Sequence, residues 1–285
     1  MLLKEYRTYF LEKLDSLYGA IEAESLFTIA LEELKGWKRI DLAIQPGAEL
    51  SGEEIKNWNE VLSQLEQHKP IQYIFGKAHF YGLDFEVNSN TLIPRPETEE
   101  LVQWIIGENE FRGKIKILDI GTGSGCIAVS LAKNLPGASV AALDVSADAL
   151  AVANRNAVSN GVAVDFMQRD ILTLKSLPDT YDVIVSNPPY VRHLEKAEIK
   201  DNVLQYEPHL ALFVEDNDAL RFYRKIALLG KNHLSSGGKL YFEINQYLGQ
   251  ETAEMLESYG YKQVELKKDI YGNDRMISCI SDFRL

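Results

Sequence analysis

The chain has 285 residues, of which 46% are hydrophobic and 25% are charged, and its 30 basic and 42 acidic side chains give a net charge of −12 at pH 7. At about 150 residues per domain this length predicts roughly two domains, and the composition excludes disordered and collagen-like chains. The excess of acidic side chains argues against a general affinity for nucleic-acid backbones, which requires a basic face.

Residues 1–75 are predicted to form a small helical domain. Apolar side chains recur there at steps of three and four residues, as expected for helices that each bury one stripe. Ser51 and Glu54 have the spacing of a capping box, which predicts that a helix begins between them. The two clearest stripes consist of Leu3, Tyr6, Phe10, Leu14 and Leu17, and of Trp58, Val61, Leu62 and Leu65.

Residues 76–96 are predicted to form a hairpin linker, and residues 97–285 an α/β domain. In the linker, short aromatic runs lie on both sides of Gly82, a pattern typical of two strands joined by a turn. After the linker, apolar runs of strand length alternate with segments of helix length, which implies right-handed crossovers and a mostly parallel sheet. The predicted strands are residues 115–118, 139–143, 162–167, 181–185, 239–244, 261–266 and 276–280.

A glycine-rich loop, Asp-Ile-Gly-Thr-Gly-Ser-Gly at residues 119–125, follows the first of these strands. Its three glycines allow a sharp turn and close approach to a ligand at a helix N-terminus. Asp144 follows the next strand, where its carboxylate can accept hydrogen bonds from two ribose hydroxyls. The G-x-G-x-G spacing, with no Gly-Lys-Ser/Thr after it, favours S-adenosylmethionine over a dinucleotide. Taken alone, the loop would also fit a simple strand-to-helix turn.

Asp170 and Ile171 follow the third strand at the same edge of the predicted sheet. Asp170 is placed to bond the adenine amino group, and Ile171 to pack on the ring. An aspartate at such a position is, however, more often a turn or helix-cap residue.

The most informative residues are Asn187, Pro188, Pro189 and Tyr190, which follow the strand around residue 183. If that strand neighbours the first, this loop faces the cofactor. An amide or aromatic amine nitrogen is a poor nucleophile because its lone pair is delocalised. The Asn187 side-chain carbonyl and the Pro188 backbone carbonyl are two rigid acceptors that can orient such a nitrogen, and Tyr190 is predicted to form an aromatic wall.

The same four residues leave other functions open. A DNA or RNA adenine or cytosine amino-methyltransferase would use them, but it would also need a basic groove or a target-recognition domain, and neither part of the chain is basic. A protein module that only senses S-adenosylmethionine would give Asn187, Pro188, Pro189 and Tyr190 no role. Away from the glycine loop, Asn-Pro-Pro would equally fit a stiff turn.

The chain resembles the HemK/PrmC-type N5-glutamine methyltransferases, which act on peptide chain release factors. The resemblance implies a Rossmann-like, S-adenosylmethionine-dependent methyltransferase domain behind the helical domain. It also implies methyl transfer to the side-chain amide nitrogen of the glutamine in the Gly-Gly-Gln motif of the release factor. The resemblance spans nearly the whole chain and is carried by residues 72–76, 80–82, 93–99 (Ile-Pro-Arg-Pro-Glu-Thr-Glu), 119–125 and 187–190.

The resemblance also assigns roles to individual residues. Asn187 to Tyr190 would hold the glutamine, the helical domain would help to grip the release factor, and Arg95 and Glu97 would shape the pocket entrance. From the sequence alone, Arg95 and Glu97 would more readily be a surface ion pair. The implied cofactor contacts are Gly121, Thr122, Gly123, Ser124, Gly125, Asp144, Asp170, Ile171 and Asn187.

Two departures from the family pattern bear on loop geometry rather than on chemistry. Residues 214–219 lack glycines that relatives often carry there, and Asn245 stands where a glycine usually follows Glu243 and Ile244.

The sequence predicts no metal site, no membrane contact and no direct DNA contact. Two isolated cysteines form neither a disulfide framework nor a metal cage, and the five histidines lack ligand spacing. Charges at Lys4, Glu5 and Arg7 interrupt the apolar stretch that a secretion signal needs. These features together predict a cytoplasmic protein.

Overall fold

The computed structural model describes residues 1–282, which form two compact units. One unit comprises Met1–Gly76 with the short segment Asp201–Tyr206, and the other comprises Lys77–Lys200 and the chain from Glu207 onward. No helix within residues 1–282 is long and apolar enough to cross a bilayer. The predicted division at residues 75 and 96 into three domains stays a prediction.

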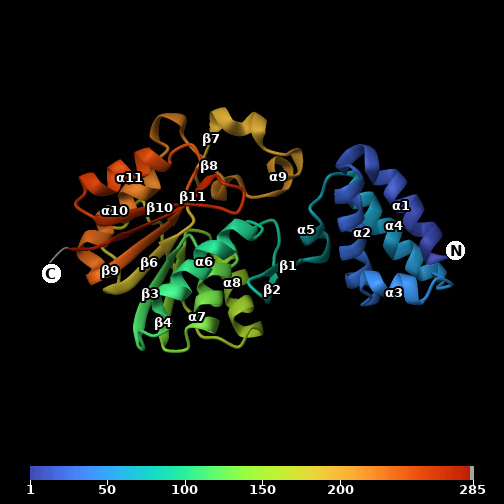
Figure 1. The fold of residues 1–285 in the computed structure, drawn as a ribbon, viewed down its shortest axis with the longest axis horizontal. Helices are drawn as coiled ribbons and strands as arrows, with labels where there is room; N and C mark the ends of the chain where they lie inside the picture. Colours follow the sequence, from blue (N-terminus) through green and yellow to red (C-terminus); the bar gives the residue numbers. More distant parts are fainter. Residues whose placement is uncertain (283–285) are drawn as a thin grey trace. The chain divides into compact units, whose positions relative to one another are not determined.

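The first unit is a helical bundle (Figure 1), and the Trp58 side chain is fully buried in its core. Phe27 stacks on the indole with the ring centroids 5.1 Å apart. Both predicted stripes are buried except for Leu17, which is 41% exposed, because Tyr18 takes the next inward position and donates its hydroxyl proton to the Leu65 carbonyl at 2.7 Å. The helices of this unit are α1 (Leu3–Tyr18), α2 (Ala20–Lys35), α3 (Arg39–Ile44), α4 (Gly52–Glu66), α5 (Ile71–Phe75) and α9 (Asp201–Tyr206).

The predicted capping box begins α4. Ser51 Oγ accepts a hydrogen bond from the Glu54 backbone N–H at 3.2 Å, and the Glu54 carboxylate accepts one from the Ser51 N–H at 2.8 Å. A hydrogen bond from Lys35 on α2 lowers the pKa of Glu54 to about 2. This helix start is therefore fixed both locally and by its neighbour.

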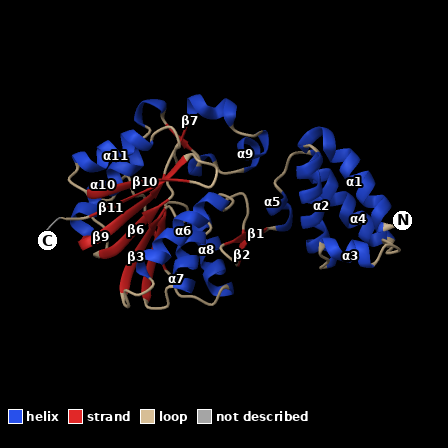
Figure 2. Ribbon diagram, viewed as in Figure 1, coloured by secondary structure: helices blue, strands red, loops and turns tan. Residues whose placement is uncertain are grey.

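The second unit contains a seven-stranded sheet in the order β10-β11-β9-β6-β3-β4-β5 (Figure 2). The strands from β5 to β9 in this order pair in parallel, and β11 is antiparallel to both of its neighbours. The predicted mostly parallel sheet of seven strands is confirmed, although the strand predicted at residues 162–167 begins at Asp165. The strands are β3 (Ile115–Ile120), β4 (Ala138–Asp144), β5 (Asp165–Gln168), β6 (Tyr181–Ser186), β9 (Leu234–Glu243), β10 (Lys262–Lys268) and β11 (Asp274–Ile280).

Helices cover both faces of the sheet (Figure 2). Ile117 and Leu118 are adjacent on β3 and belong to different core clusters, because successive side chains of a strand point to opposite faces. One cluster packs under α6 (Pro96–Asn109), α7 (Cys126–Asn134) and α8 (Ala147–Ser159). The other packs under α10 (Arg221–His233) and α11 (Gly249–Ser258).

The predicted hairpin is formed by β1 (Lys77–Phe80) and β2 (Leu83–Glu86), which pair antiparallel. The two turn residues, Tyr81 and Gly82, both have positive φ, as a two-residue hairpin turn requires. The side chain of Phe80 is buried in the cluster on the α6 side of the sheet. The hairpin thus belongs to the core of the second unit.

The strand order reverses at β3, which lies between β4 and β6. In such sheets the crevice beyond the carboxyl ends of these strands is the usual ligand site. Two short strands, β7 (Val191–Arg192) and β8 (Phe213–Val214), pair beyond this edge. The segment at residues 214–219 that lacks glycines continues from β8 into a 3₁₀ turn at Asp216–Asp218, and Asp216 accepts a hydrogen bond from the Leu194 N–H at 3.0 Å.

Candidate active site

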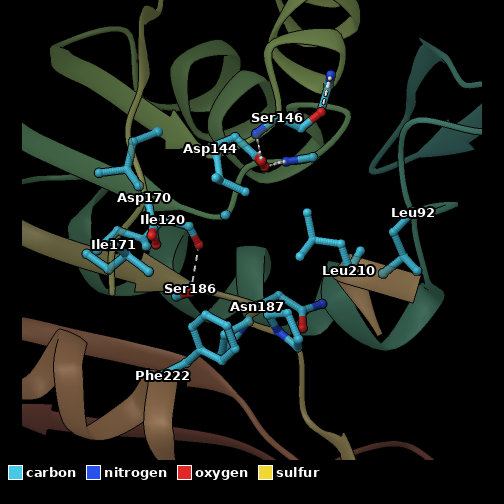
Figure 3. A pocket seen from close by; sticks show the side chains of 18 of the residues that line it. Leu92, Ile120, Asp144, Ser146, Asp170, Ile171, Ser186, Asn187, Leu210 and Phe222 are labelled. Carbon is cyan, nitrogen blue, oxygen red and sulfur yellow. Dashed lines mark hydrogen bonds between the residues drawn. The ribbon is translucent and has the colours of Figure 1, made fainter. Parts of the chain in front are cut away.

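A cavity of about 350 Å³ lies at the carboxyl ends of β3, β4 and β6 (Figure 3). The structure therefore brings together loops that the sequence separates by dozens of residues. The predicted site residues on its wall are Gly121, Gly123, Asp144, Asp170, Ile171, Asn187, Pro188 and Pro189. The predicted site residues away from its wall are Arg95, Glu97, Thr122, Ser124, Gly125 and Tyr190.

Glycine is required at the three loop positions for different structural reasons. All have positive φ, at 75° for Gly121, 55° for Gly123 and 81° for Gly125. A Cβ on Gly121 or Gly123 would meet nothing within 4 Å, so both keep backbone open to the cavity. A Cβ on Gly125 would lie 3.0 Å from the Cβ of Ala153 on α8. The first two glycines thus leave the backbone accessible to a ligand in the cavity, and the third allows α8 to pack closely against the loop.

Asp144 holds the glycine loop while it lines the cavity. Its Oδ2 accepts a hydrogen bond from the Gly123 N–H at 2.9 Å, and its Oδ1 accepts one from the Ser146 N–H at 2.9 Å. Each carboxylate oxygen can accept a second bond, so the carboxylate retains acceptor capacity for ribose hydroxyls.

Asp119, the last polar residue of β3, supports the same loop through a hydrogen bond from Thr122. It is fully buried, and its Oδ2 accepts a hydrogen bond from the Thr122 hydroxyl at 2.6 Å. Its Oδ1 has no hydrogen-bond partner within the described chain, residues 1–282. Burial raises the pKa of Asp119 to about 7, against the lowering effects of the Thr122 hydroxyl and the nearby Ala128 backbone N–H. The sequence analysis included Asp119 in the loop but gave it no role.

One end of the cavity combines a carboxylate with apolar side chains. Asp170 Oδ1 accepts a hydrogen bond from the Leu172 N–H at 2.9 Å, so it is a turn residue as well as a wall residue. Ile171 lies beside it, Phe222 lies nearer to Asn187, and Leu210 lies across the cavity (Figure 3). Phe222 was not predicted, since an apolar residue near the start of α10 carries no signal that separates a wall position from a core position.

The Asn187–Tyr190 loop begins where β6 is fixed to β3 by the Ser186 hydroxyl, which donates to the Ile120 carbonyl at 2.6 Å. Asn187 lies on the cavity wall. Tyr190 does not, because its hydroxyl donates to Oε1 of the buried Glu243 at 3.0 Å. Burial raises the pKa of Tyr190 well above its usual range, so the hydroxyl keeps its proton.

Two residues from distant elements complete the support of this loop. Thr98, in the first turn of α6, donates its hydroxyl proton to Glu243 Oε2 at 2.5 Å and accepts a hydrogen bond from Asn187 Nδ2 at 3.4 Å. Asn245, whose side chain is buried, donates to the Tyr190 carbonyl at 2.9 Å. None of these supporting residues was predicted from the sequence, because each lies more than 50 residues from its partner in the loop.

Arg95 and Glu97 lie outside the cavity wall, and only the first has a strong partner. Arg95 Nη2 pairs with Glu207 Oε1 at 2.6 Å, and the same buried carboxylate accepts a hydrogen bond from the Ile93 N–H at 3.2 Å. Glu97 lies half-buried in the first turn of α6, where an acidic side chain suits the helix dipole. The arrangement braces the proline-rich segment; a role at the pocket entrance stays a prediction.

The wall chemistry fits S-adenosylmethionine. Open backbone at Gly121 and Gly123 allows close approach, the Asp144 carboxylate suits two ribose hydroxyls, and Ile171 with Phe222 offers apolar faces to a planar base. No group of three or more His, Cys, Asp or Glu side chains within residues 1–282 is arranged to hold a metal ion.

Comparisons with known proteins agree with this architecture. Residues 10–76 match the PrmC N-terminal domain family, and residues 100–210 match the Methyltransferase small domain family. The structure of a methyltransferase from Pyrococcus furiosus superposes with a TM-score of 0.51 at 20% identity, covering 76% of this chain and 96% of that one, and so shares the fold.

Curated relatives match nearly the whole chain. The release factor glutamine methyltransferase of Flavobacterium psychrophilum is 60% identical over 280 residues, which cover 97% of this chain and 98% of that protein. The release factor glutamine methyltransferase of Bacteroides thetaiotaomicron is 45% identical, with 95% of this chain and 97% of that protein covered. With this degree of identity across both units, the chain belongs to the family of release factor glutamine methyltransferases.

Proposed function

We propose that the protein transfers a methyl group from S-adenosylmethionine to the side-chain amide nitrogen of the glutamine in the Gly-Gly-Gln motif of peptide chain release factors. The observation that carries this proposal is a single cavity with the glycine loop and Asp144 on one wall and the two acceptors of Asn187 and Pro188 on another. Its family membership supports the same reaction and the same protein substrate.

Bound S-adenosylmethionine supplies a methyl group on a positively charged sulfur. The Asn187 side-chain carbonyl accepts one N–H of the target amide, and the Pro188 backbone carbonyl accepts the other. These two acceptors hold the nitrogen with its lone pair directed at the methyl carbon, which is an orientation effect. No strong base is required at first, because the nitrogen becomes acidic only as it gains the methyl group.

The partner and the compartment follow from the same proposal. A release factor is a folded protein, so we expect the helical unit to contribute to binding it. The net charge of −12 disfavours a nucleic-acid substrate, whose phosphates would be repelled. Because release factors act on ribosomes, the proposed site of action is the cytoplasm.

The test measures transfer of labelled methyl from S-adenosylmethionine to three substrates side by side. These are purified release factor, the same factor with its Gly-Gly-Gln glutamine replaced, and duplex DNA. We expect label on the unmodified release factor alone. Label on DNA alone would overturn the proposal in favour of a nucleic-acid amino-methyltransferase.

Replacing Asn187 tests the catalytic assignment. Asn187→Ala removes one of the two acceptors, and we expect the transfer rate to fall by at least about 100-fold through loss of orientation. Binding of S-adenosylmethionine, measured by calorimetry, should change much less. A transfer rate equal to that of the wild type would remove Asn187 from the mechanism.

A further inference from the structure

A continuous chain of hydrogen bonds runs beneath the Asn187–Tyr190 loop. The Tyr190 hydroxyl donates to Glu243 Oε1 at 3.0 Å, and the Thr98 hydroxyl donates to Glu243 Oε2 at 2.5 Å. Thr98 Oγ1 in turn lies 3.4 Å from Asn187 Nδ2. Thr98 is 2% exposed and Glu243 is 1% exposed, and neither lines the cavity. The chain therefore connects the cavity wall to a carboxylate that does not itself reach the cavity.

We propose that Glu243 and Thr98 are positioning residues that fix which end of the Asn187 side-chain amide faces the target nitrogen. This inference rests on the proposed function, in which the carbonyl end of that amide accepts an N–H from the substrate.

The number of hydroxyl protons in this chain of hydrogen bonds fixes the direction of each bond. A carboxylate only accepts hydrogen bonds, so the single hydroxyl proton of Thr98 is committed to Glu243. The lone pairs of Thr98 Oγ1 are then left to accept, and they can accept only from the nitrogen end of the Asn187 amide. The carboxylate thus sets the direction of every bond in the chain.

An asparagine amide has two orientations of nearly the same shape, related by a half turn. In the flipped orientation the Asn187 oxygen would face Thr98 Oγ1, and two acceptors without a proton between them repel. The Asn187 nitrogen would then present N–H groups to a substrate amide that itself offers N–H groups. Only the orientation selected by Thr98 places an acceptor where the substrate needs one.

Hydrogen bonds and a nearby positive charge offset part of the cost of burying the Glu243 carboxylate. Burial raises the pKa of Glu243, but the hydrogen bonds from Thr98 and Tyr190 and the positive charge of Arg275 oppose the rise. Both carboxylate oxygens are bonded, so the group has the partners that a buried charge requires.

The inference also explains why a threonine follows the prolines at residues 93–99. That segment is braced by Arg95 and Glu207, and it leads into α6, whose first turn carries Thr98 inward. The segment thereby connects the support of Asn187 to a rigid helix start.

The first experiment compares Thr98→Val with Thr98→Ser. Valine keeps the shape of threonine and removes the hydroxyl, and we expect kcat to fall about tenfold or more with little change in the affinity for S-adenosylmethionine. Serine retains the hydroxyl and should restore kcat to within about threefold. Thr252→Val is the matched control, since Thr252 is a buried threonine of the same unit whose hydroxyl donates to the Leu248 carbonyl one turn earlier in its own helix. A wild-type kcat in Thr98→Val would overturn the inference.

A double-mutant cycle separates positioning from general support of the fold. If Thr98 acts through Asn187, Thr98→Val should have no further effect on the residual rate of Asn187→Ala. Glu243→Gln provides a second entry to the same cycle, because its amide can donate to Thr98 and release the hydroxyl proton toward a flipped Asn187. Effects that multiply with those of Asn187→Ala would overturn the inference.

A readout without substrate keeps this inference distinct from the proposed function. The side-chain amide resonance of Asn187 is identified in nitrogen–proton spectra by its loss in Asn187→Ala. We expect it to shift in Thr98→Val and Glu243→Gln but not in Thr252→Val, whether or not the wild type methylates a release factor. An unshifted resonance would refute the positioning role, whereas an inactive wild type with the expected shifts would refute only the choice of substrate.

Discussion

The two walls of the cavity each rest on a buried carboxylate, but the carboxylates reach their loops in different ways. Asp119 lies directly before the glycine loop and binds Thr122, three residues along the chain. Glu243 binds Tyr190 and, through Thr98, Asn187, across more than 50 residues of sequence. One wall is therefore supported by local chain geometry, and the other by the packing of three separate elements.

The two carboxylates also differ in how many of their oxygens accept hydrogen bonds. Both oxygens of Glu243 accept hydrogen bonds from hydroxyls, whereas Oδ1 of Asp119 has no partner among the residues that the structure describes. Burying a charged carboxylate costs more folding free energy when one of its oxygens lacks a hydrogen bond than when both oxygens are bonded. We therefore expect Asp119 to reduce the stability of the fold more than Glu243 does, although both carboxylates support a loop of the cavity.

The largest expected effect concerns the pH dependence of Asp119. Its pKa is about 7 in the folded chain against 3.8 in the unfolded chain, so its favourable contribution to stability is complete below pH 4 and is lost as the pH rises to about 7. Relative to Asp119→Asn, the wild type should lose about 3 kcal/mol of unfolding free energy between pH 5 and pH 8. Urea unfolding of both proteins at the two pH values measures this difference.

Glu243→Gln provides the comparison for that experiment. Because both Glu243 oxygens are bonded, the wild type should lose less unfolding free energy relative to Glu243→Gln over the same pH range. Equal losses of unfolding free energy for Asp119 and Glu243 would contradict the proposed difference in how the two carboxylates are bonded.

A smaller effect is expected from the third loop glycine. Gly125→Ala adds a methyl group 3.0 Å from the Cβ and 3.3 Å from the Cα of Ala153, and the backbone of α8 cannot yield easily. We expect it to be less stable than Gly121→Ala by about 2 kcal/mol, because both share the strain of a positive φ but only one meets a neighbour. Denaturant midpoints without cofactor test this difference, and equal midpoints would show that α8 adjusts freely.

The smallest effect is expected at Asp144. Asp144→Asn replaces one acceptor oxygen by a donor, so it can no longer accept from both Gly123 and Ser146, and the affinity for S-adenosylmethionine should fall about tenfold. The rate at saturating cofactor should change little, since the other wall is untouched. Asp148→Asn, an exposed acid in the first turn of α8, is the matched control for the loss of charge. A fall in affinity of the same size in Asp148→Asn would assign the effect to net charge instead.

Elements with a strong local pattern were predictable from the sequence. The stripe around Trp58, the capping box at Ser51 and the alternation of strands and helices depend on neighbours along the chain, and all are present in the structure. The exposure of Leu17 was not predicted, because a repeat of three or four residues does not say which of two adjacent apolar residues faces inward at a helix end.

The loops that make up the site can be identified from local sequence: three glycines with a following Asp144, and Asn187 with two rigid prolines. The glycines share one short loop and Asn187 adjoins its two prolines, so neighbouring residues identify each motif, and Asp144 is recognised by its place at the end of the next strand.

The support of those loops and the orientation of their side chains depend on contacts between distant parts of the chain. Thr98, Glu243 and Asn245 come from α6, from the end of β9 and from the segment after it, and they meet beneath one loop because the sheet places β6 beside β9. The same packing turned the Tyr190 hydroxyl toward Glu243 and away from the cavity wall. Hydrogen-bond direction depends on partners that lie far apart along the chain, so no local pattern encodes it.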